Sequence, residues 1–574
     1  MKFKQRCYND RKIWAQSDAL RCGIGWDEED IEKPLILVED VFGESHPGSV
    51  HLDKLAENAN IGIYSNGGKP ANFHVTDVCD GWAQGHDGMN YILASREIIA
   101  DMVEIHASAS KWDGLILISS CDKAIPAHLR VAARLDLPTI FIPGGSMRPG
   151  PYMSDSGKGG EVSLREKQCT ISQREVLDYK LTGCPTCGAC QFMGTASTMQ
   201  CMAEALGLAL PGSALCPATG NDILRGAKNA GKQVLELLKN GITARKILTP
   251  AAFKNAIVVH AAIGGSTNAL IHFPAIAQEM GFELDLTLFD EMNKIIPHIC
   301  NVTPSGKHPT ELLWAAGGIP MVQWMLRDYL DLSVMTATGK TLGENLEALN
   351  NEGYFERILG YLYNYGLKRE DVIYPIEETK VYGSVAILKG NIAPEGAVIK
   401  YSAVAPNMLC HIGKARVFNS EEACNQAVVN NEVEPGSVLF IRYEGPRGSG
   451  MPEMLMTTES IMNNEKLKAS TVLVTDGRFS GATKGPCIGH VSPEAAAGGP
   501  IALVEDDDIV ELDVHNRKIN VIGINGEKCS LEEVEKIFNE RKKSWKAPDY
   551  STRKGIFGRY TAHATSGMKG AYIK

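Results

Sequence analysis

Short, continuous apolar runs alternate with amphipathic stretches along the first part of the chain. The runs "PLILV" (34–38), "LILIS" (115–119) and "PTIFI" (138–142) have the length of buried strands. Residues 95–112 and 126–137 lie before the second and third runs and repeat their apolar positions at helical spacing. Strand, helix and strand in this order predict βαβ units and a mainly parallel sheet.

The pattern changes after about residue 380. The segments "SVAILKG", "AVIKYSAV", "SVLFIRYEG", "STVLVTDG" and "DIVELDVHNRKINVIG" are β-rich and are separated by Gly/Pro turns. A chain of 574 residues is also too long for one core. We therefore expect an α/β fold in two domains. These are an N-terminal α/β domain with a mainly parallel sheet (1–380) and a C-terminal β-barrel-like domain (381–574).

Composition and charge narrow the class of protein. Hydrophobic residues at 44% and charged residues at 22% are ordinary for a globular protein. The net charge of −10, without a dense Lys/Arg run, argues against nucleic acid as a partner. The N-terminus has no apolar stretch of signal-peptide length, and no later stretch approaches a membrane span. We expect a cytoplasmic protein without a membrane partner, which must hold any anionic substrate through local cations or a metal.

The cysteines do not form a disulfide pattern. There are fifteen, spread irregularly, as in proteins of a reducing compartment. Three of them, Cys184, Cys187 and Cys190, form a C-x-x-C-x-x-C run, a spacing used by iron–sulfur proteins and in part by zinc sites. The run alone does not indicate which thiols bind a metal.

Two Cys-Asp pairs add to this pattern. Cys121 and Asp122, followed by Lys123, come directly after the apolar run at 115–119, and Cys79 precedes Asp80. Ligand sites of parallel sheets lie beyond the carboxyl ends of the strands. The pairs therefore predict a composite site with thiolates on iron and carboxylates on a hard cation. The alternative is coincidence in a cysteine-rich chain, with a buried thiol at a polar strand end.

Several longer segments resemble one known family. They are "CDGWAQGHDGMNYILASREIIAD", "SCDKAIP", "CQFMGTAST", "AAIGGSTNALIH", "GNIAPEGAVIK", "YEGPRGSGMPEM" and "TDGRFSGATKGPCIGHVSPEAAAGGPIA". Together they are similar to the dihydroxy-acid/phosphogluconate dehydratase family, in the right order over residues 34–510. The resemblance implies an α/β domain and a β-barrel domain with an iron–sulfur cluster and Mg²⁺ between them.

The resemblance also implies roles for individual residues. Cysteines that match cluster ligands are Cys121 and Cys190, and acids that match magnesium ligands are Asp80, Asp122 and Glu453. Lys123 matches a lysine that family members carry as a carbamate, which turns an amine into an oxygen ligand. Ser480 matches the base that removes the C2 proton.

One position departs from the family. Many members with a two-iron cluster have Pro-Cys-Asn where this chain has "HPGSVHL", with Gly48 in place of the cysteine. Cys79 offers a replacement thiol. We therefore expect a cluster on Cys79, Cys121 and Cys190, of the 4Fe-4S rather than the 2Fe-2S type, and structural roles for Cys184 and Cys187.

The resemblance implies a hydro-lyase that converts a 2,3-dihydroxy acid to a 2-keto-3-deoxy acid. Stretches such as "AEALGLALPGSALCP" and "TGKTLGENLE" resemble sugar-acid dehydratases, so we expect a D-xylonate-like aldonate as substrate. The alternative is a dihydroxy-acid dehydratase of branched-chain amino-acid biosynthesis. A non-catalytic iron–sulfur sensor is a third hypothesis, against which the set of Ser480, Glu453 and Lys123 argues. We expect a homodimer or homotetramer.

Overall fold

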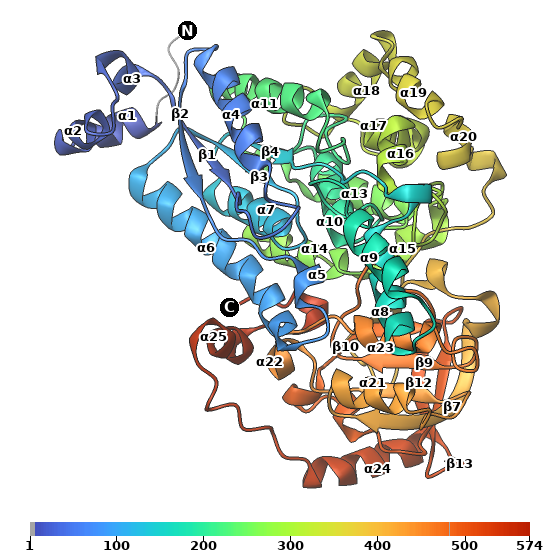
Figure 1. The fold of residues 1–574 in the computed structure, drawn as a ribbon. Helices are drawn as coiled ribbons and strands as arrows, with labels where there is room; N and C mark the ends of the chain where they lie inside the picture. The colour runs from blue at the N-terminus through green and yellow to red at the C-terminus, as the bar shows by residue number, and fades with distance from the viewer. Residues whose placement is uncertain (1–5, 482) are drawn as a thin grey trace.

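A four-stranded parallel sheet lies near the N-terminus of the computed structural model, which describes residues 6–481 and 483–574 (Figure 1). Its order is β2-β1-β3-β4, and each neighbouring pair is parallel. The strands are β1 (Leu35–Asp40), β2 (Lys69–His74), β3 (Gly114–Ser119) and β4 (Thr139–Pro143). β1, β3 and β4 are buried along their whole length, as the apolar runs predict. The expected parallel sheet is confirmed.

Helices cover this sheet in two packed pairs. α4 (Leu52–Tyr64) packs against α11 (Asn221–Asn240), and α6 (Ile92–Ser110) packs against α7 (Ala124–Leu135). A Cβ at Gly62 would lie 2.0 Å from the carbonyl oxygen of Lys228, and one at Gly231 would lie 2.0 Å from that of Ala59. These two glycines therefore allow α4 and α11 to touch backbone to backbone.

The middle of the chain is helical. At its centre lies α10 (Thr195–Ala205), in which every residue is buried and which packs against the helices over residues 250–263, 269–279 and 318–325. A helix that is buried on all sides belongs to the interior of a large core. The others are α13 (Pro250–Ile263), α14 (Ala269–Glu279), α15 (Thr287–Ile295), α16 (Thr310–Ala315), α17 (Gly318–Met325), α18 (Leu342–Asn351) and α19 (Tyr354–Tyr363).

The C-terminal part contains a curled mixed sheet of nine strands. Its order is β13-β12-β11-β7-β8-β9-β10-β6-β5, parallel from β7 to β10 and antiparallel on either side. The strands are β5 (Ala386–Leu388), β6 (Gly396–Ile399), β7 (Cys410–Phe418), β8 (Val438–Ile441), β9 (Val472–Thr475), β10 (Cys487–Ser492), β11 (Ile509–Asp513), β12 (Lys518–Ile524) and β13 (Glu527–Lys528). Lys389, just after β5, pairs with Lys518 of β12, so the sheet curls back on itself. This agrees with the expected barrel-like fold; the domain limits 1–380 and 381–574 stay a prediction.

The remaining α-helices are divided between the two parts of the chain. In the N-terminal part they are α1 (Arg6–Arg11), α2 (Gln16–Cys22), α3 (Glu28–Glu32), α5 (Asp80–Ala83), α8 (Gly159–Lys167), α9 (Gln173–Thr182), α12 (Ala244–Ile247) and α20 (Arg369–Val372). In the C-terminal part they are α21 (Glu421–Val429), α22 (Pro446–Ser449), α23 (Leu455–Met462), α24 (Leu531–Ser544) and α25 (Gly555–His563). None of the helices within residues 6–481 and 483–574 has the length and apolar character needed to cross a membrane.

The C-terminal residues return to the first part of the molecule. The buried guanidinium group of Arg96, on α6, donates hydrogen bonds to the carbonyl oxygens of Gly570 and Ala571, both at 2.9 Å. The backbone N–H of Ile573 donates to Glu97 Oε2 at 3.2 Å. These contacts join the end of the chain to the helix that precedes β3.

Candidate active site

Both Cys-Asp pairs lie at one edge of the parallel sheet. Cys121, Asp122 and Lys123 follow β3 after one residue, Ser120, and Lys123 is the N-cap of α7. Cys79 is the N-cap of α5, which begins at Asp80, after β2. Because β2 and β3 both run parallel to β1, their carboxyl ends lie at the same edge of the sheet. The strand order changes direction between β1 and β3, and such a switch point is where open α/β sheets bind ligands.

Three carboxylates meet at this edge. Oxygen atoms of Asp80, Asp122 and Glu453 lie within 4.8 Å of one another. Glu453 comes from the C-terminal part, between α22 and α23. Asp80 Oδ1 is buried without a hydrogen-bond partner among the described residues. Gathered carboxylates with an unsatisfied buried oxygen fit a hard cation such as Mg²⁺.

Two basic side chains balance this acidic group. Lys123 Nζ donates a hydrogen bond to Asp80 Oδ2 at 2.9 Å and lies 3.6 Å from Asp122 Oδ2. Arg478 donates to Glu453 Oε1 and lies 3.4 Å from Asp80 Oδ2. Burial, followed by the charge of Asp80, raises the pKa of Asp122 to about 8. Burial alone would raise the pKa of Asp80 as well, but the charges of Lys123 and Arg478 outweigh it and lower that pKa. Neighbouring acids with opposite pKa shifts are typical of functional sites.

Two amides orient the carboxylate of Glu453. Gln84 Nε2 donates to Glu453 Oε2 at 3.0 Å, and Asn268 Nδ2 donates to Glu453 Oε1 at 3.0 Å. Asn268, the N-cap of α14, also donates to Thr195 Oγ1 at 2.8 Å. Asn268, the last residue of the stretch "GGSTN" (264–268), therefore contacts the acidic group directly.

A group of soft ligands lies beside the acids. The Sγ atoms of Cys79 and Cys121 and a ring nitrogen of His46 lie within 4.8 Å of one another. The hydrogen bond from Cys121 is the largest of the effects that lower the pKa of Cys79 to about 7. The same contact, together with burial, raises the pKa of Cys121. Cys79 is therefore partly a thiolate at neutral pH, the form that binds iron.

Cys190 lies outside that group of three. Burial, followed by the charge of Cys79, raises its pKa. The charge of Cys79 also contributes, after burial, to raising the pKa of the exposed Cys184, whereas it is not among the causes that shift the pKa of Cys187. Two thiols of the C-x-x-C-x-x-C run therefore lie within electrostatic reach of Cys79.

The stretch around Gly48 borders the thiols. A Cβ built at Gly48 would lie 3.5 Å from Cys121 Sγ, so a cysteine at this position would reach the same group. The backbone N–H of Gly48 instead donates to His46 Nδ1 at 3.2 Å, and His46 Nε2 lies 3.4 Å from Asp77 Oδ2. The sequence analysis missed His46, although it stands two residues before the position that departs from the family.

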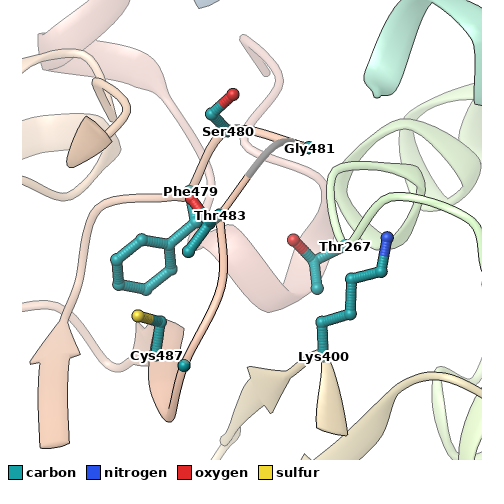
Figure 2. A pocket seen from close by; sticks show the side chains of 8 residues that line it. Thr267, Lys400, Phe479, Ser480, Gly481, Thr483 and Cys487 are labelled. Atoms are coloured by element: carbon teal, nitrogen blue, oxygen red, sulfur yellow. The ribbon is translucent and has the colours of Figure 1, made fainter. Parts of the chain in front are cut away.

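Ser480 lies in the loop between β9 and β10, two residues after Arg478. It lines a cavity of about 20 Å³, drawn in Figure 2. The other lining residues are Thr267, Lys400, Phe479, Gly481, Thr483, Gly485 and Cys487. The loop thus contributes Arg478 to the acidic group and Ser480 to the cavity. Ser480 is among the residues predicted from the sequence and Arg478 is not, although both belong to "TDGRFSG".

Comparison with known proteins identifies the family. Residues 33–345 match the family described as dihydroxy-acid/6-phosphogluconate dehydratase N-terminal, and residues 371–571 match its C-terminal counterpart. The chain belongs to the dihydroxy-acid/6-phosphogluconate dehydratase family. The resemblance inferred from the sequence motifs is thereby confirmed.

Relatives cover nearly the whole chain. A dihydroxy-acid dehydratase of Acetivibrio thermocellus is 43% identical over 563 residues, 97% of each chain. One of Halothermothrix orenii is 43% identical over 97% of each chain, and one of Caldanaerobacter subterraneus subsp. tengcongensis is 44% identical over 97% of this chain and 96% of the relative. The protein is an enzyme of the hydro-lyase class, a dehydratase, and not a non-catalytic sensor. The names of these relatives favour the dihydroxy-acid alternative over the expected sugar acid.

Proposed function

We propose that the protein is a dihydroxy-acid dehydratase that converts 2,3-dihydroxyisovalerate, a branched-chain 2,3-dihydroxy acid, to the corresponding 2-keto acid. The relatives that carry this activity in their names match the chain over 97% of its length. The sugar-acid interpretation depends on short stretches alone. The observation that carries the proposal is the repeated Cys-Asp pair at the ends of β2 and β3, completed by Glu453.

We propose two metal centres at this edge of the sheet. Cys79, Cys121 and Cys190 hold an iron–sulfur cluster, of the four-iron type because Gly48 replaces the cysteine of two-iron members. Two features support this assignment: Cys79 and Cys121 lie together, and the pKa of Cys79 is lowered to about 7. Three thiolates would leave one iron of such a cluster without a protein ligand, and that iron could bind the substrate.

The acidic group holds the second centre. Asp80, Asp122 and Glu453 bind Mg²⁺, and Lys123 joins them as a carbamate. The unpartnered Asp80 Oδ1 and the convergence of three carboxylates support a divalent cation here. When bound, the iron and the magnesium supply Lewis acidity toward the 3-hydroxyl group and positive charge beside the Ser480 loop.

The side chains of the protein then divide the work of dehydration. Ser480 Oγ, in its alkoxide form, accepts the proton from C2, and the bond from C3 to its hydroxyl oxygen breaks with the electron pair on oxygen. That oxygen gains a proton in place of the one removed from C2 and leaves as water, and the enol product tautomerises to the 2-keto acid. C2 is formally oxidised and C3 formally reduced by the same two electrons, so the molecule as a whole is neither oxidised nor reduced and no electron donor is required. Arg478 stays beside Asp80 when Lys123 is a carbamate, and its positive charge favours the ionised form of the Asp80 carboxylate.

The proposal is tested by turnover of the reconstituted enzyme. The protein is loaded with iron, sulfide and Mg²⁺ under anaerobic conditions and incubated with 2,3-dihydroxyisovalerate, and the 2-keto acid is measured. We expect turnover that disappears after chelation of the metals. Dehydration of D-xylonate without dehydration of 2,3-dihydroxyisovalerate would favour the sugar-acid function. Light scattering on the same preparation tests the expected homodimer or homotetramer.

A further inference from the structure

Lys400 carries a buried amine at the cavity that Ser480 lines. It follows β6 directly, and Figure 2 shows its side chain extending alongside Thr267. Its Nζ is buried and has no hydrogen-bond partner in the part of the chain that the structure describes. Buried lysines are rarely found without a partner, because an unpaired charge in the interior is costly. The unpaired amine therefore indicates that a bound ligand, and not a side chain of the protein, is its partner.

The electrostatics of the cavity agree with this. Burial lowers the pKa of Lys400 to about 8, and no acidic side chain within the described residues offsets that shift. His260 and His298 lie within electrostatic reach of Lys400: burial first, and the charge of Lys400 after it, lower both of their pKa values to about 4. Both histidines are therefore neutral at pH 7, while Lys400 is still mostly protonated. Lys400 is the one cationic side chain among the described residues that line the cavity.

Two segments of the chain connect the cavity to the acidic group. Thr267 lines it, and the next residue, Asn268, donates to Glu453 Oε1. Ser480 lines it as well, and Arg478, two residues earlier, pairs with the same carboxylate. At about 20 Å³ the cavity has room for a water-sized polar group, as one end of a small acid provides.

We propose that Lys400 is a substrate-binding residue whose ammonium group pairs with the carboxylate of the substrate acid in the cavity shared with Ser480 and Thr267. This inference rests on the proposed function and adds the group that recognises the acid. Pairing at Lys400 holds C2, the neighbour of the carboxylate, within reach of Ser480. It also makes the enzyme discriminate against neutral analogues, because these leave the buried ammonium group unpaired.

The test is a binding measurement that needs no turnover. The probe is 2-hydroxy-3-methylbutyrate, which lacks the 3-hydroxyl group that would leave, and the comparison ligand is its primary amide. Calorimetry on the metal-loaded enzyme compares wild type with Lys400→Met, Lys400→Arg and the exposed control Lys389→Met. We expect Lys400→Met to bind the acid about 10- to 100-fold more weakly and the amide as wild type does. Lys389→Met should match wild type for both ligands.

Kinetics and stability supply independent readouts. In wild type, kcat/KM should fall above about pH 8 as Lys400 loses its proton, and Lys400→Arg should remove that fall because a guanidinium group stays charged. Without ligand, Lys400→Met should melt at the same or a higher temperature than wild type, because an unpaired buried charge is lost. Cluster and magnesium content should not change.

Equal binding of acid and amide by wild type, or unchanged binding of the acid by Lys400→Met, would overturn the inference. The test of Lys400 can fail or succeed independently of the test of the proposed function. If wild type fails to dehydrate 2,3-dihydroxyisovalerate but Lys400→Met loses the preference for the acid, the carboxylate site stands and the assigned substrate is wrong. If wild type turns over this substrate and the variant keeps its preference, the inference about Lys400 alone is wrong.

Discussion

Lys123 Nζ donates a hydrogen bond to Asp80 Oδ2 at 2.9 Å, with the lysine side chain fully buried. As an ammonium group it is a counter-ion to the carboxylates around it. As a carbamate, formed when the neutral amine adds carbon dioxide and releases a proton, it becomes one more oxygen ligand. The two forms predict different behaviour when the side chain is changed to arginine, which keeps the charge but cannot form the carbamate.

We expect Lys123→Arg to lose activity by about 100-fold or more, together with affinity for Mg²⁺. The loss follows from the missing oxygen ligand and not from a missing charge. The measurement is activity against magnesium concentration, with Lys232→Arg, a change at an exposed lysine, as control. Wild-type activity and magnesium affinity in Lys123→Arg would show that Lys123 acts only as a counter-ion.

Ser480→Ala should lower kcat by about 1000-fold or more while cluster and magnesium content stay constant. The reason is that the C2 proton loses its acceptor, which acts only in the transition state. The deciding measurement is exchange of the C2 hydrogen of bound substrate with solvent, compared with the control Ser470→Ala. Exchange at the wild-type rate in Ser480→Ala would assign the base to another residue.

Cys79→Ser and Cys190→Ser should each reduce the iron and sulfide bound per chain, because each removes a proposed cluster ligand. Cys184→Ser decides the open question in the C-x-x-C-x-x-C run, since Cys184 also lies within electrostatic reach of Cys79. We expect it to keep full iron and sulfide content, as the exposed control Cys169→Ser does. Loss of the cluster in Cys184→Ser but not in Cys190→Ser would reverse the assignment.

The buried carboxyl group of Glu204 should make the stability of the protein depend on pH. Burial raises its pKa from 4.5 to about 7, although the backbone N–H groups of Gly212 and Ala214 donate to it at 2.7 Å. Because the folded state holds this proton more tightly than the unfolded state does, the stabilisation is complete below pH 4.5 and disappears as pH rises through 7. The difference is on the order of 3 kcal/mol.

Glu204→Gln should remove that dependence. Urea unfolding at pH 5 and pH 8 should show wild type losing stability relative to the variant as pH rises. The comparison of the two proteins cancels the other groups that titrate in this range. A difference between wild type and variant that is equal at both pH values would mean that Glu204 does not carry a raised pKa.

The sequence predicted those parts of the site that lie next to each other along the chain. The apolar run of β3 ends at Cys121, Asp122 and Lys123, and the parallel order of strands brings Cys79 and Asp80 to the same edge. These predictions were possible because the length of an apolar run indicates a strand, and ligands of parallel sheets lie beyond the carboxyl ends of the strands. Both rules use only nearby residues. Glu453 came from the resemblance alone, because nothing in its own neighbourhood indicates a partner far away in the chain.

The remaining site residues depend on contacts over long distances in the sequence. Arg478 reaches Asp80 across 398 positions, which no local pattern can indicate. His46 lies in a loop, two residues before Gly48, and Lys400 follows an apolar strand. Neither neighbourhood indicates a ligand site. The order of the nine-stranded sheet, in which β5 and β12 meet through Lys389, is likewise set by packing between distant segments.

The ratio of kcat/KM for 2,3-dihydroxyisovalerate to that for D-xylonate, measured on one anaerobically reconstituted preparation, tests the assigned substrate and metal centre together. We expect a ratio of about 100 or more, because a site for a compact branched acid rejects a longer polyhydroxy chain. The assignment also requires that activity follow the iron and sulfide content of the sample. A ratio below one, or full activity in a sample that holds zinc and no iron, would contradict it.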